Sequence, residues 1–332
     1  MNDALIDVPV ALIFFARPDV LKETFSAIKN ARPSKLFLIQ DGPREGRMDD
    51  AEDIKKCRDI VSDIDWKCEV HEDFSELNLG CGKRVYSGLT KAFESVDRLV
   101  IIEDDCVPGK SFLKFCEEIL EKYKYDERIG LISGMNHLGI YKECTDDYFF
   151  SFSGSIWGWA TWKRVWDTVD FEMSYLNDQR VSRLLLNLGN KRIVKNGKKK
   201  LTELNSGKKL SSWTYQFVLN VLLQNMLVIV PKYNLTKNIG LTTNSEHSQS
   251  SIKRVPRGLR KIYFMKSHEM EFPLKHPKFV INDIGFKKKV DRILGTGYPL
   301  VRLYRIIESV FYRILTGNFS SVVKGIKRRF AR

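Results

Sequence analysis

Apolar runs of strand length alternate with helical periodicity through the first hundred residues, and this alternation limits the possible folds. Leu21, Phe25 and Ile28 recur at helical spacing between two of the runs. Strands separated by helices predict an α/β fold with a mainly parallel sheet covered by helices on both faces. The runs that predict strands are Val8–Phe15, Lys35–Gln40, Cys68–His71 and Arg98–Glu103.

The composition of the 332 residues, 43% of them hydrophobic, suits a large globular protein with an extensive core. The first residues, MNDALID, are acidic where a secretory segment would be basic, and the apolar run Phe217–Val230 is too short and too interrupted to span a bilayer. The six cysteines form no CxxC pair, so neither a disulfide framework nor a zinc site is indicated. We therefore expect a cytoplasmic protein, soluble or peripheral to the membrane.

The formal charge of +14 is uneven along the chain. Residues 251–332 contain 20 Lys and Arg against 5 Asp and Glu, so the preceding residues are nearly neutral. Apolar residues from Leu300 to Leu315 recur on one face of a predicted helix, which is typical of a helix on an anionic membrane surface. A helix packed on the catalytic domain with a solvated basic face is the alternative. Nucleic acid is disfavoured because no recognition motif accompanies the charge.

Polar residues follow the predicted strands at the point where each ends. Arg17 follows the first strand, Asp41 the second, and Glu103, Asp104 and Asp105 end the strand that begins at Arg98. Ligands of parallel sheets bind beyond the carboxyl ends of the strands, so these side chains should share one edge. Adjacent carboxylates are most stable around a positive group, although they could instead cap a helix beginning near Lys110.

The middle of the chain has weaker patterns. Residues 151–166 are rich in tryptophan and glycine and are expected to line a pocket instead of continuing the sheet. Residues 180–212 are predicted to be a lysine-rich insertion, either a solvated excursion or a mobile loop. Ser211 or Ser212 can cap a helix from Trp213 to about Gln224, and Val228–Val230 predicts a further strand.

Eight motifs in order resemble the GT-A glycosyltransferases, which have a Rossmann-like sheet and use nucleotide-diphospho-sugars. The resemblance covers roughly residues 8–250 and is greatest to a bacterial branch similar to the N-acetylglucosaminyltransferase that starts complex N-glycans. The motifs are FAR (15–17), IQDGP (39–43), NLGCGK (78–83), IIEDD (101–105), SGMNH (133–137), GSIWGWATW (154–162), SSWTYQ (211–216) and NIG…EHS (238–248).

The resemblance implies roles for residues on the donor side. Arg17 and Asp41 would hold the uracil and ribose of a UDP-sugar, while Glu103 and Asp104 would contact ribose and sugar. Asp105 would bind Mn²⁺ or Mg²⁺ directly. His247 matches a histidine near the metal or diphosphate, or is a solvated loop residue. These hard cations prefer oxygen ligands, in agreement with the carboxylates.

Other residues are weaker candidates. Lys83, in GCGK, could reach a phosphate, but the spacing is not that of a P-loop. Trp157 or Trp159 could stack on a sugar ring, with core packing as the alternative. Asn136 could bind sugar hydroxyls or be a turn residue.

Thr214 departs from the family pattern. Many relatives carry an aspartate here as the general base of an inverting transfer, and a threonine hydroxyl cannot act as that base at neutral pH. Glu246 is an alternative base, as is a carboxylate in residues 167–178.

The sequence predicts a metal-dependent glycosyltransferase of bacterial surface-polysaccharide assembly that moves a hexose or N-acetylhexosamine to a lipid-linked acceptor. Residues 1–150 would bind the donor, residues 151–250 the acceptor, and residues 251–332 the membrane. The rivals are a nucleotidyltransferase, although FFARPD lacks the glycine-rich loop that such enzymes carry after the first strand, and a sugar-binding or scaffold protein without activity.

Overall fold

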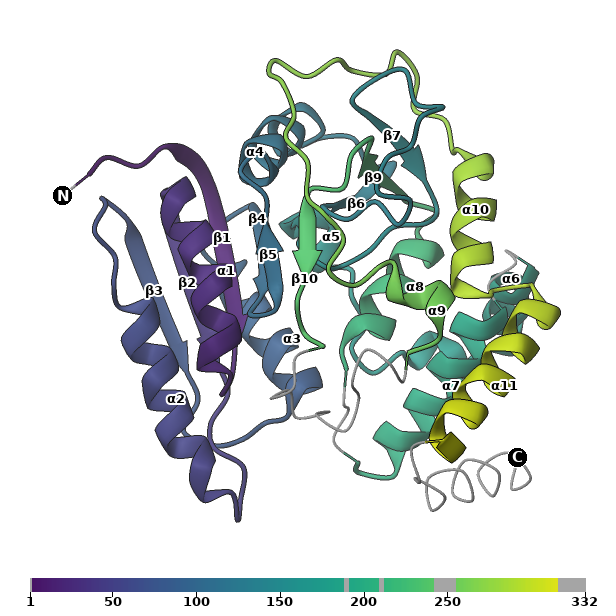
Figure 1. The fold of residues 1–332 in the computed structure, drawn as a ribbon, viewed down its shortest axis with the longest axis horizontal. Helices are drawn as coiled ribbons and strands as arrows, with labels where there is room; N and C mark the ends of the chain where they lie inside the picture. Colours follow the sequence, from purple (N-terminus) through teal and green to yellow (C-terminus); the bar gives the residue numbers. More distant parts are fainter. Residues whose placement is uncertain (1, 188–190, 209–211, 242–254, 316–332) are drawn as a thin grey trace.

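One mixed sheet forms the centre of the molecule in this computed structural model, which describes residues 2–187, 191–208, 212–241 and 255–315. Its eight strands lie in the order β3-β2-β1-β4-β8-β6-β9-β7 (Figure 1). In chain order they are β1 (Ile6–Phe14), β2 (Pro33–Gln40), β3 (Glu69–Phe74), β4 (Arg98–Glu103), β6 (Ile129–Ser133), β7 (Tyr148–Ser151), β8 (Trp159–Trp162) and β9 (Leu227–Pro231). β5 (Cys106–Pro108) and β10 (Thr236–Asn238) form a separate antiparallel pair.

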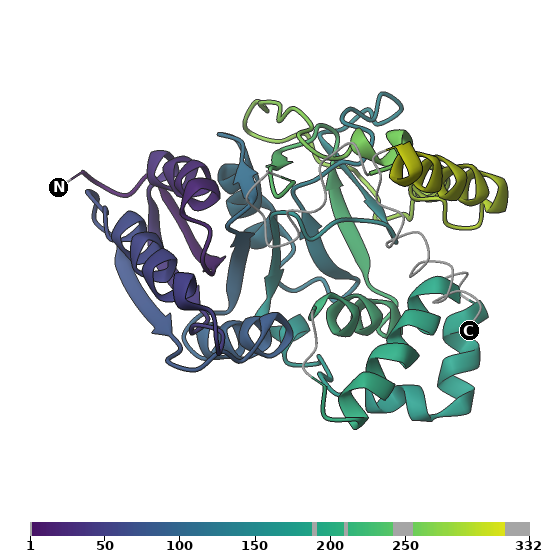
Figure 2. The ribbon, with the colours of Figure 1, turned by 60° about the horizontal axis from the view of Figure 1, so that its bottom comes forward.

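Helices flank the sheet and connect its strands (Figures 1 and 2). The α/β class predicted from the sequence is confirmed, with a Rossmann-like arrangement. The helices are α1 (Pro18–Ala31), α2 (Met48–Val61), α3 (Cys81–Ala92), α4 (Phe112–Lys122), α5 (Lys163–Trp166), the 3₁₀ helix η1 (Ser174–Asn177), α6 (Gln179–Asn187), α7 (Lys191–Asn205), α8 (Thr214–Leu223), α9 (Arg257–Arg260), α10 (Ile284–Leu294) and α11 (Pro299–Leu315).

The parallel part of the sheet is the part that the sequence predicts best. β1, β2, β3 and β4 are mutually parallel, because a helix returns the chain between each of these strands and the next. β8 is antiparallel to both β4 and β6 and lies between them. The prediction that residues 151–166 do not continue the sheet is therefore wrong for Trp159–Trp162.

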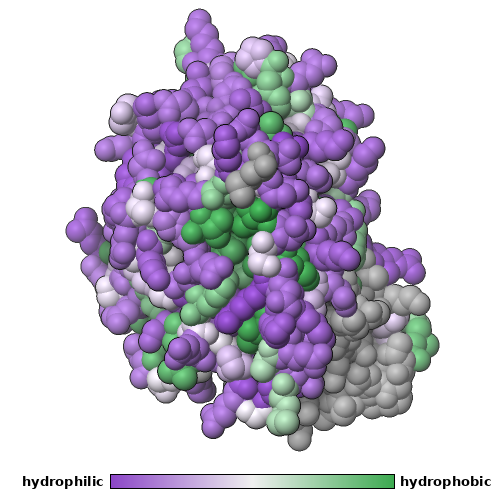
Figure 3. Space-filling model, turned by 90° about the vertical axis from the view of Figure 1, so that its left-hand side faces the viewer, coloured by the Kyte–Doolittle hydropathy of each residue, from purple (hydrophilic) through white to green (hydrophobic). Residues whose placement is uncertain are grey.

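β3 is an exposed edge strand that carries several charged residues. Its sequence, EVHEDF, includes Glu69, Glu72 and Asp73. Charged side chains on an edge strand oppose pairing with a second sheet. Seen from this side, most of the surface is hydrophilic, with an apolar patch near its centre (Figure 3).

Residues 180–212 do not form the solvated insertion that the sequence predicts. Much of this stretch folds into α6 and α7, which pack with η1 and α8 around a second, smaller core (Figure 2). Leu176, Leu185, Val194 and Leu219 are buried in this core. The helical periodicity of α7 is hard to detect in the sequence, because lysines on its outer face separate the widely spaced apolar residues.

The C-terminal helices differ in how they pack. α10 buries Phe286 and Val290 in the main core. α11 leaves six large apolar side chains exposed: Leu300, Leu303, Tyr304, Ile307, Phe311 and Leu315. Among the helices of the described ranges, none is both long enough and apolar enough to span a bilayer.

Candidate functional site

The carboxyl ends of β1 and β4 bring together an arginine and two aspartates, as predicted. The Arg17 guanidinium lies between the two carboxylates: its Nε is 3.1 Å from Asp104 Oδ2, and its Nη1 is 3.1 Å from Asp105 Oδ2. Arg17 Nη2 also donates to Asp104 Oδ1. Asp104 is almost fully buried, so this pairing offsets much of the cost of removing its charge from water. The helix-cap alternative is wrong, because β5 separates the acids from α4.

Asp105 has further contacts that fix its orientation. Asn238 Nδ2, at the end of β10, donates to Asp105 Oδ1 at 3.2 Å, and Ile239 N donates to the Asp105 carbonyl at 2.9 Å. A Cβ atom on Gly240 would lie 2.3 Å from Asp105 Oδ2, so a larger residue here would displace the Asp105 carboxylate. The sequence grouped Asn238 and Gly240 in the NIG motif but gave them no role. Only the pairing of β5 with β10 brings them to Asp105.

Glu103 completes the acidic cluster and connects it to α8. Burial and the negative charges of Asp105 and Asp104 raise the pKa of Glu103 to about 8, while Arg17 and a hydrogen bond from Trp213 oppose the shift. Trp213 immediately precedes α8 and stacks on Trp159 with ring centroids 5.3 Å apart. Trp213, in the SSWTYQ motif, therefore contacts the acidic cluster directly through Glu103. The sequence alone did not predict this role for Trp213.

Asp41 positions the loop before α3. Its Oδ1 accepts from Leu79 N at 2.8 Å, and its Oδ2 accepts from Gly80 N at 2.9 Å. Gly80 has φ = 80°, a conformation that favours glycine. Lys83 is exposed in the first turn of α3. Asp41 thus holds the loop that leads into α3 and Lys83. The contacts of Asp41 and Lys83 with a nucleotide stay predictions.

Cys81 shows that these parts surround one region. Although solvent reaches Cys81, the surrounding protein and then the negative charges of Glu103, Asp104 and Asp41 raise the pKa of its thiol. Arg17 opposes the shift. The ends of β1, β2 and β4 therefore converge at the start of α3, as the parallel arrangement predicts.

The acidic cluster fits a divalent cation that is shared with a ligand. Mg²⁺ is commonly held by one or two carboxylates together with phosphate oxygens, and carboxylate oxygens are the donors available here. No set of three or more His, Cys, Asp or Glu side chains within the described ranges forms a complete metal site. His247, predicted to lie near the metal, is outside the described residues.

Two predicted sugar contacts are wrong. Asn136 is fully buried: its Nδ2 donates to the carbonyls of Pro231 and Lys232, both at 2.9 Å, and its Oδ1 accepts from Leu138 N. It is the turn residue of the alternative interpretation. Trp159 is also fully buried in the core.

Trp157 remains available as a stacking residue. It is partly buried and packs against Tyr263, with ring centroids 5.0 Å apart. Its predicted contact with a sugar stays a prediction.

Thr214 begins α8, one residue after the predicted start, and Trp213 occupies the N-cap without a side-chain capping bond. Ser212 is therefore not the helix cap, although its Oγ accepts from Thr214 N at 3.2 Å and donates to Thr214 Oγ1 at 2.9 Å. Glu246, the alternative base, is outside the described residues. The identity of the base stays a prediction.

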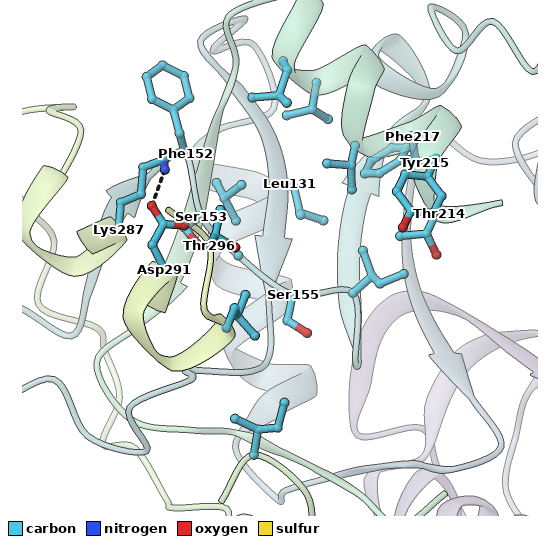
Figure 4. A pocket seen from close by; sticks show the side chains of 18 of the residues that line it. Leu131, Phe152, Ser153, Ser155, Thr214, Tyr215, Phe217, Lys287, Asp291 and Thr296 are labelled. Atoms are coloured by element: carbon cyan, nitrogen blue, oxygen red, sulfur yellow. Dashed lines mark hydrogen bonds and ion pairs between the residues drawn. The ribbon is translucent and has the colours of Figure 1, made fainter. Parts of the chain in front are cut away.

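A cavity of about 530 Å³ lies beside Thr214 (Figure 4). Thr214, Tyr215 and Phe217 of α8 line one side, and Lys287 and Asp291 of α10 line the other. Ser153–Ile156, in the tryptophan-rich segment, also line it. The prediction that residues 151–166 line a pocket is confirmed for this part.

Comparison with known proteins gives only distant similarities. No protein-family profile and no curated protein matches the chain. A solved UDP-glucose pyrophosphorylase in complex with UDP-glucose is 9% identical, with 69% of this chain and 92% of that chain covered and a TM-score of 0.36. The inositol-1-phosphate CTP transferase from T. maritima is 12% identical, with 74% and 92% covered and a TM-score of 0.37. A 4-diphosphocytidyl-2C-methyl-D-erythritol synthase from Anaerococcus prevotii is 14% identical, with 69% and 89% covered and a TM-score of 0.35.

Proposed function

We propose that this protein is a metal-dependent glycosyltransferase that moves a hexose or N-acetylhexosamine from a UDP-sugar to a lipid-linked saccharide. The observation that carries the proposal is the cluster of Arg17, Asp104 and Asp105 at the carboxyl ends of β1 and β4. Its place in the sheet is the usual place for a nucleotide ligand. The motif resemblance supplies the reaction type.

In this proposal each donor-side residue has a distinct task. Asp105 holds Mn²⁺ or Mg²⁺, which when bound neutralises charge on the diphosphate leaving group. Arg17 and Asp41 contact the nucleoside, and Lys83 contacts a phosphate. Glu103 and Asp104 contact ribose and sugar. Asn238 and Gly240 keep the Asp105 carboxylate in position.

The base in this proposal is a carboxylate outside the described residues, Glu246. Proton removal by a positioned base typically contributes about 10²–10⁴-fold to rate. Glu246→Gln should therefore lower turnover at saturating donor at least about tenfold while UDP affinity stays unchanged. Turnover equal to wild type would exclude Glu246.

Membrane attachment is proposed for α11. Its apolar stripe, the six exposed residues Leu300 to Leu315 named above, faces away from the protein, whereas Glu308 accepts a hydrogen bond from Arg257 N on the inner side. Residues 316–332 add five Lys or Arg and no acidic residue. An outward apolar stripe next to basic residues suits an anionic membrane surface at the cytoplasmic face.

The main alternative is nucleotidyl transfer. Only three residues, Phe15–Arg17, separate β1 from α1, and none is a glycine. The short connection supports glycosyl transfer over a glycine-rich triphosphate loop. Incubation with UTP and a sugar phosphate would reveal the alternative by releasing pyrophosphate.

The decisive experiment compares UDP binding by Asp105→Asn and wild type with and without Mn²⁺. Loss of the charge should lower Mn²⁺-dependent UDP affinity about tenfold or more, because a hard cation requires an anionic oxygen ligand. Asp59→Asn, on exposed α2, is the matched control and should bind as wild type does. Equal affinity in Asp105→Asn and wild type would contradict the proposal. UDP-sugar hydrolysis that depends on Mn²⁺ would exclude the inactive-scaffold alternative.

A further inference from the structure

The cavity beside Thr214 has the size and lining of a ligand pocket. Its volume of about 530 Å³ lies within the range of roughly 300–1,000 Å³ that is typical of small-molecule sites. Val218, Val221 and Leu222 of α8 form one apolar wall. Leu259 and Ile262, from the segment that contains α9, add further apolar side chains to the lining. A well-packed core does not leave an apolar space of this size between its helices.

One end of the cavity borders the acidic cluster. Thr214 lines the cavity, and its neighbour Trp213 contacts Glu103. Tyr263 also lines the cavity and lies close enough to Asp105 for the negative charge of that carboxylate, after burial, to raise the pKa of the tyrosine. A molecule held in the cavity would therefore lie next to the donor site, beside the start of α8.

The other end leads towards α11. Lys287 and Asp291 form an ion pair of 2.6 Å at this end, and Thr296 lies in the connection from α10 to α11 (Figure 4). The exposed apolar stripe of α11 begins at Leu300, four residues after Thr296. The apolar lining of the cavity and the exposed apolar stripe of α11 thus lie at the same end of the molecule.

We infer that the cavity binds the hydrocarbon chain of an amphipathic acceptor, with the polar head of that acceptor directed towards Asp105. A hydrocarbon chain would pack against the apolar side chains of α8 and of the segment that contains α9. The polar groups at the Thr214 end would hydrogen-bond a sugar. The inference rests on the proposed function, because it names the part of the lipid-linked acceptor that the protein recognises.

The test measures binding of methyl, butyl, hexyl and octyl β-glucoside, each below its micelle concentration, by calorimetry with the full-length protein. Burial of each methylene is expected to strengthen binding up to about fourfold, so octyl glucoside should bind at least about tenfold more tightly than butyl glucoside. Val218→Trp and Leu259→Trp fill the cavity from two different segments and should each remove this dependence. Leu184→Trp adds the same bulk at an exposed position on α6 and should keep it.

Affinity that does not depend on chain length in the wild type would overturn the inference, as would a steep dependence in both filled variants. Two variants are used so that a folding defect in one leaves the other informative. Mn²⁺-dependent UDP binding, measured on the same samples, tests the donor site separately. Normal UDP binding together with chain-independent glucoside binding would reject the lipid pocket and leave the proposed transferase intact.

Discussion

The donor side and the α6–α8 side of the molecule satisfy their buried polar groups differently. On the donor side, Asp104 is paired with Arg17, and Arg84 Nη2 donates to Asp73 Oδ2 at 2.5 Å. On the α6–α8 side, Tyr175 Oη of η1 and both amide atoms of Gln216 of α8 are buried without a hydrogen-bond partner among the described residues. Two further unpaired atoms lie at the central sheet: His137 Nδ1, after β6, and Trp159 Nε1, in β8.

The two sides therefore differ in how they are prepared to bind a ligand. The donor side is pre-organised by its own contacts, so its residues can bind a charged ligand without rearranging. The α6–α8 side combines an apolar cavity with the unpaired polar atoms of Tyr175 and Gln216, which do not line that cavity.

Replacing Arg17, the positively charged residue of the donor side, should have the largest effect on stability. Arg17→Leu leaves the buried carboxylate of Asp104 without its positive partner, which should lower the free energy of unfolding by about 3 kcal/mol. Urea unfolding at pH 7 measures this change. Arg17→Lys keeps the charge but not the paired geometry and should lose less. A loss in Arg17→Leu no greater than that in Arg17→Lys would show that the donor side does not depend on this pairing.

His137 should make stability depend on pH. Burial lowers the pKa of His137 to about 4, below the ordinary value of 6.5. The unfolded chain therefore binds a proton at this position before the folded chain does, and stability is lost as the pH falls through 6.5. Between pH 7 and pH 5 the contribution is about 2 kcal/mol. His137→Gln should lose that much less than wild type in urea unfolding at the two pH values. Parallel losses in both proteins would contradict the prediction.

Gln216→Leu should stabilise the protein. Both amide atoms of Gln216 are buried without a partner in the described structure, and a leucine of similar volume removes that cost. The free energy of unfolding should rise by about 1 kcal/mol. Asn220→Leu is the matched control on the same helix, because Asn220 Nδ2 donates to Thr168 Oγ1 at 2.8 Å, and it should destabilise. Destabilisation by both would mean that Gln216 has a partner after all.

Thr214→Ala should have the smallest effect. The hydroxyl cannot act as a base at neutral pH and bonds only to Ser212 among the described residues, so turnover should change less than about twofold. Thr214→Asp would raise turnover if the site lacks a base. A large loss in Thr214→Ala would assign the threonine a direct role in the reaction.

The parallel strands and their polar ends could be predicted because the information is local. A continuous apolar run followed by helical periodicity fixes β1, β2 and β4, and parallel strands place Arg17 and Asp105 at one edge. The motif NIG was visible in the sequence, but its contact with Asp105 was not. That contact depends on β10 pairing with β5 across more than 100 residues. Asn136 misled the prediction because two of its three backbone partners, Pro231 and Lys232, lie far away in the sequence.

The α/β class and the acidic edge of the sheet follow from local sequence, since strand and helix periodicity act over a few residues. Tertiary packing, in contrast, places Trp159 in a central strand and lets α6 and α7 build a second core. It also places α8 between the acids and a cavity. These features arise from packing between distant segments, where the burial of apolar surface outweighs local preference.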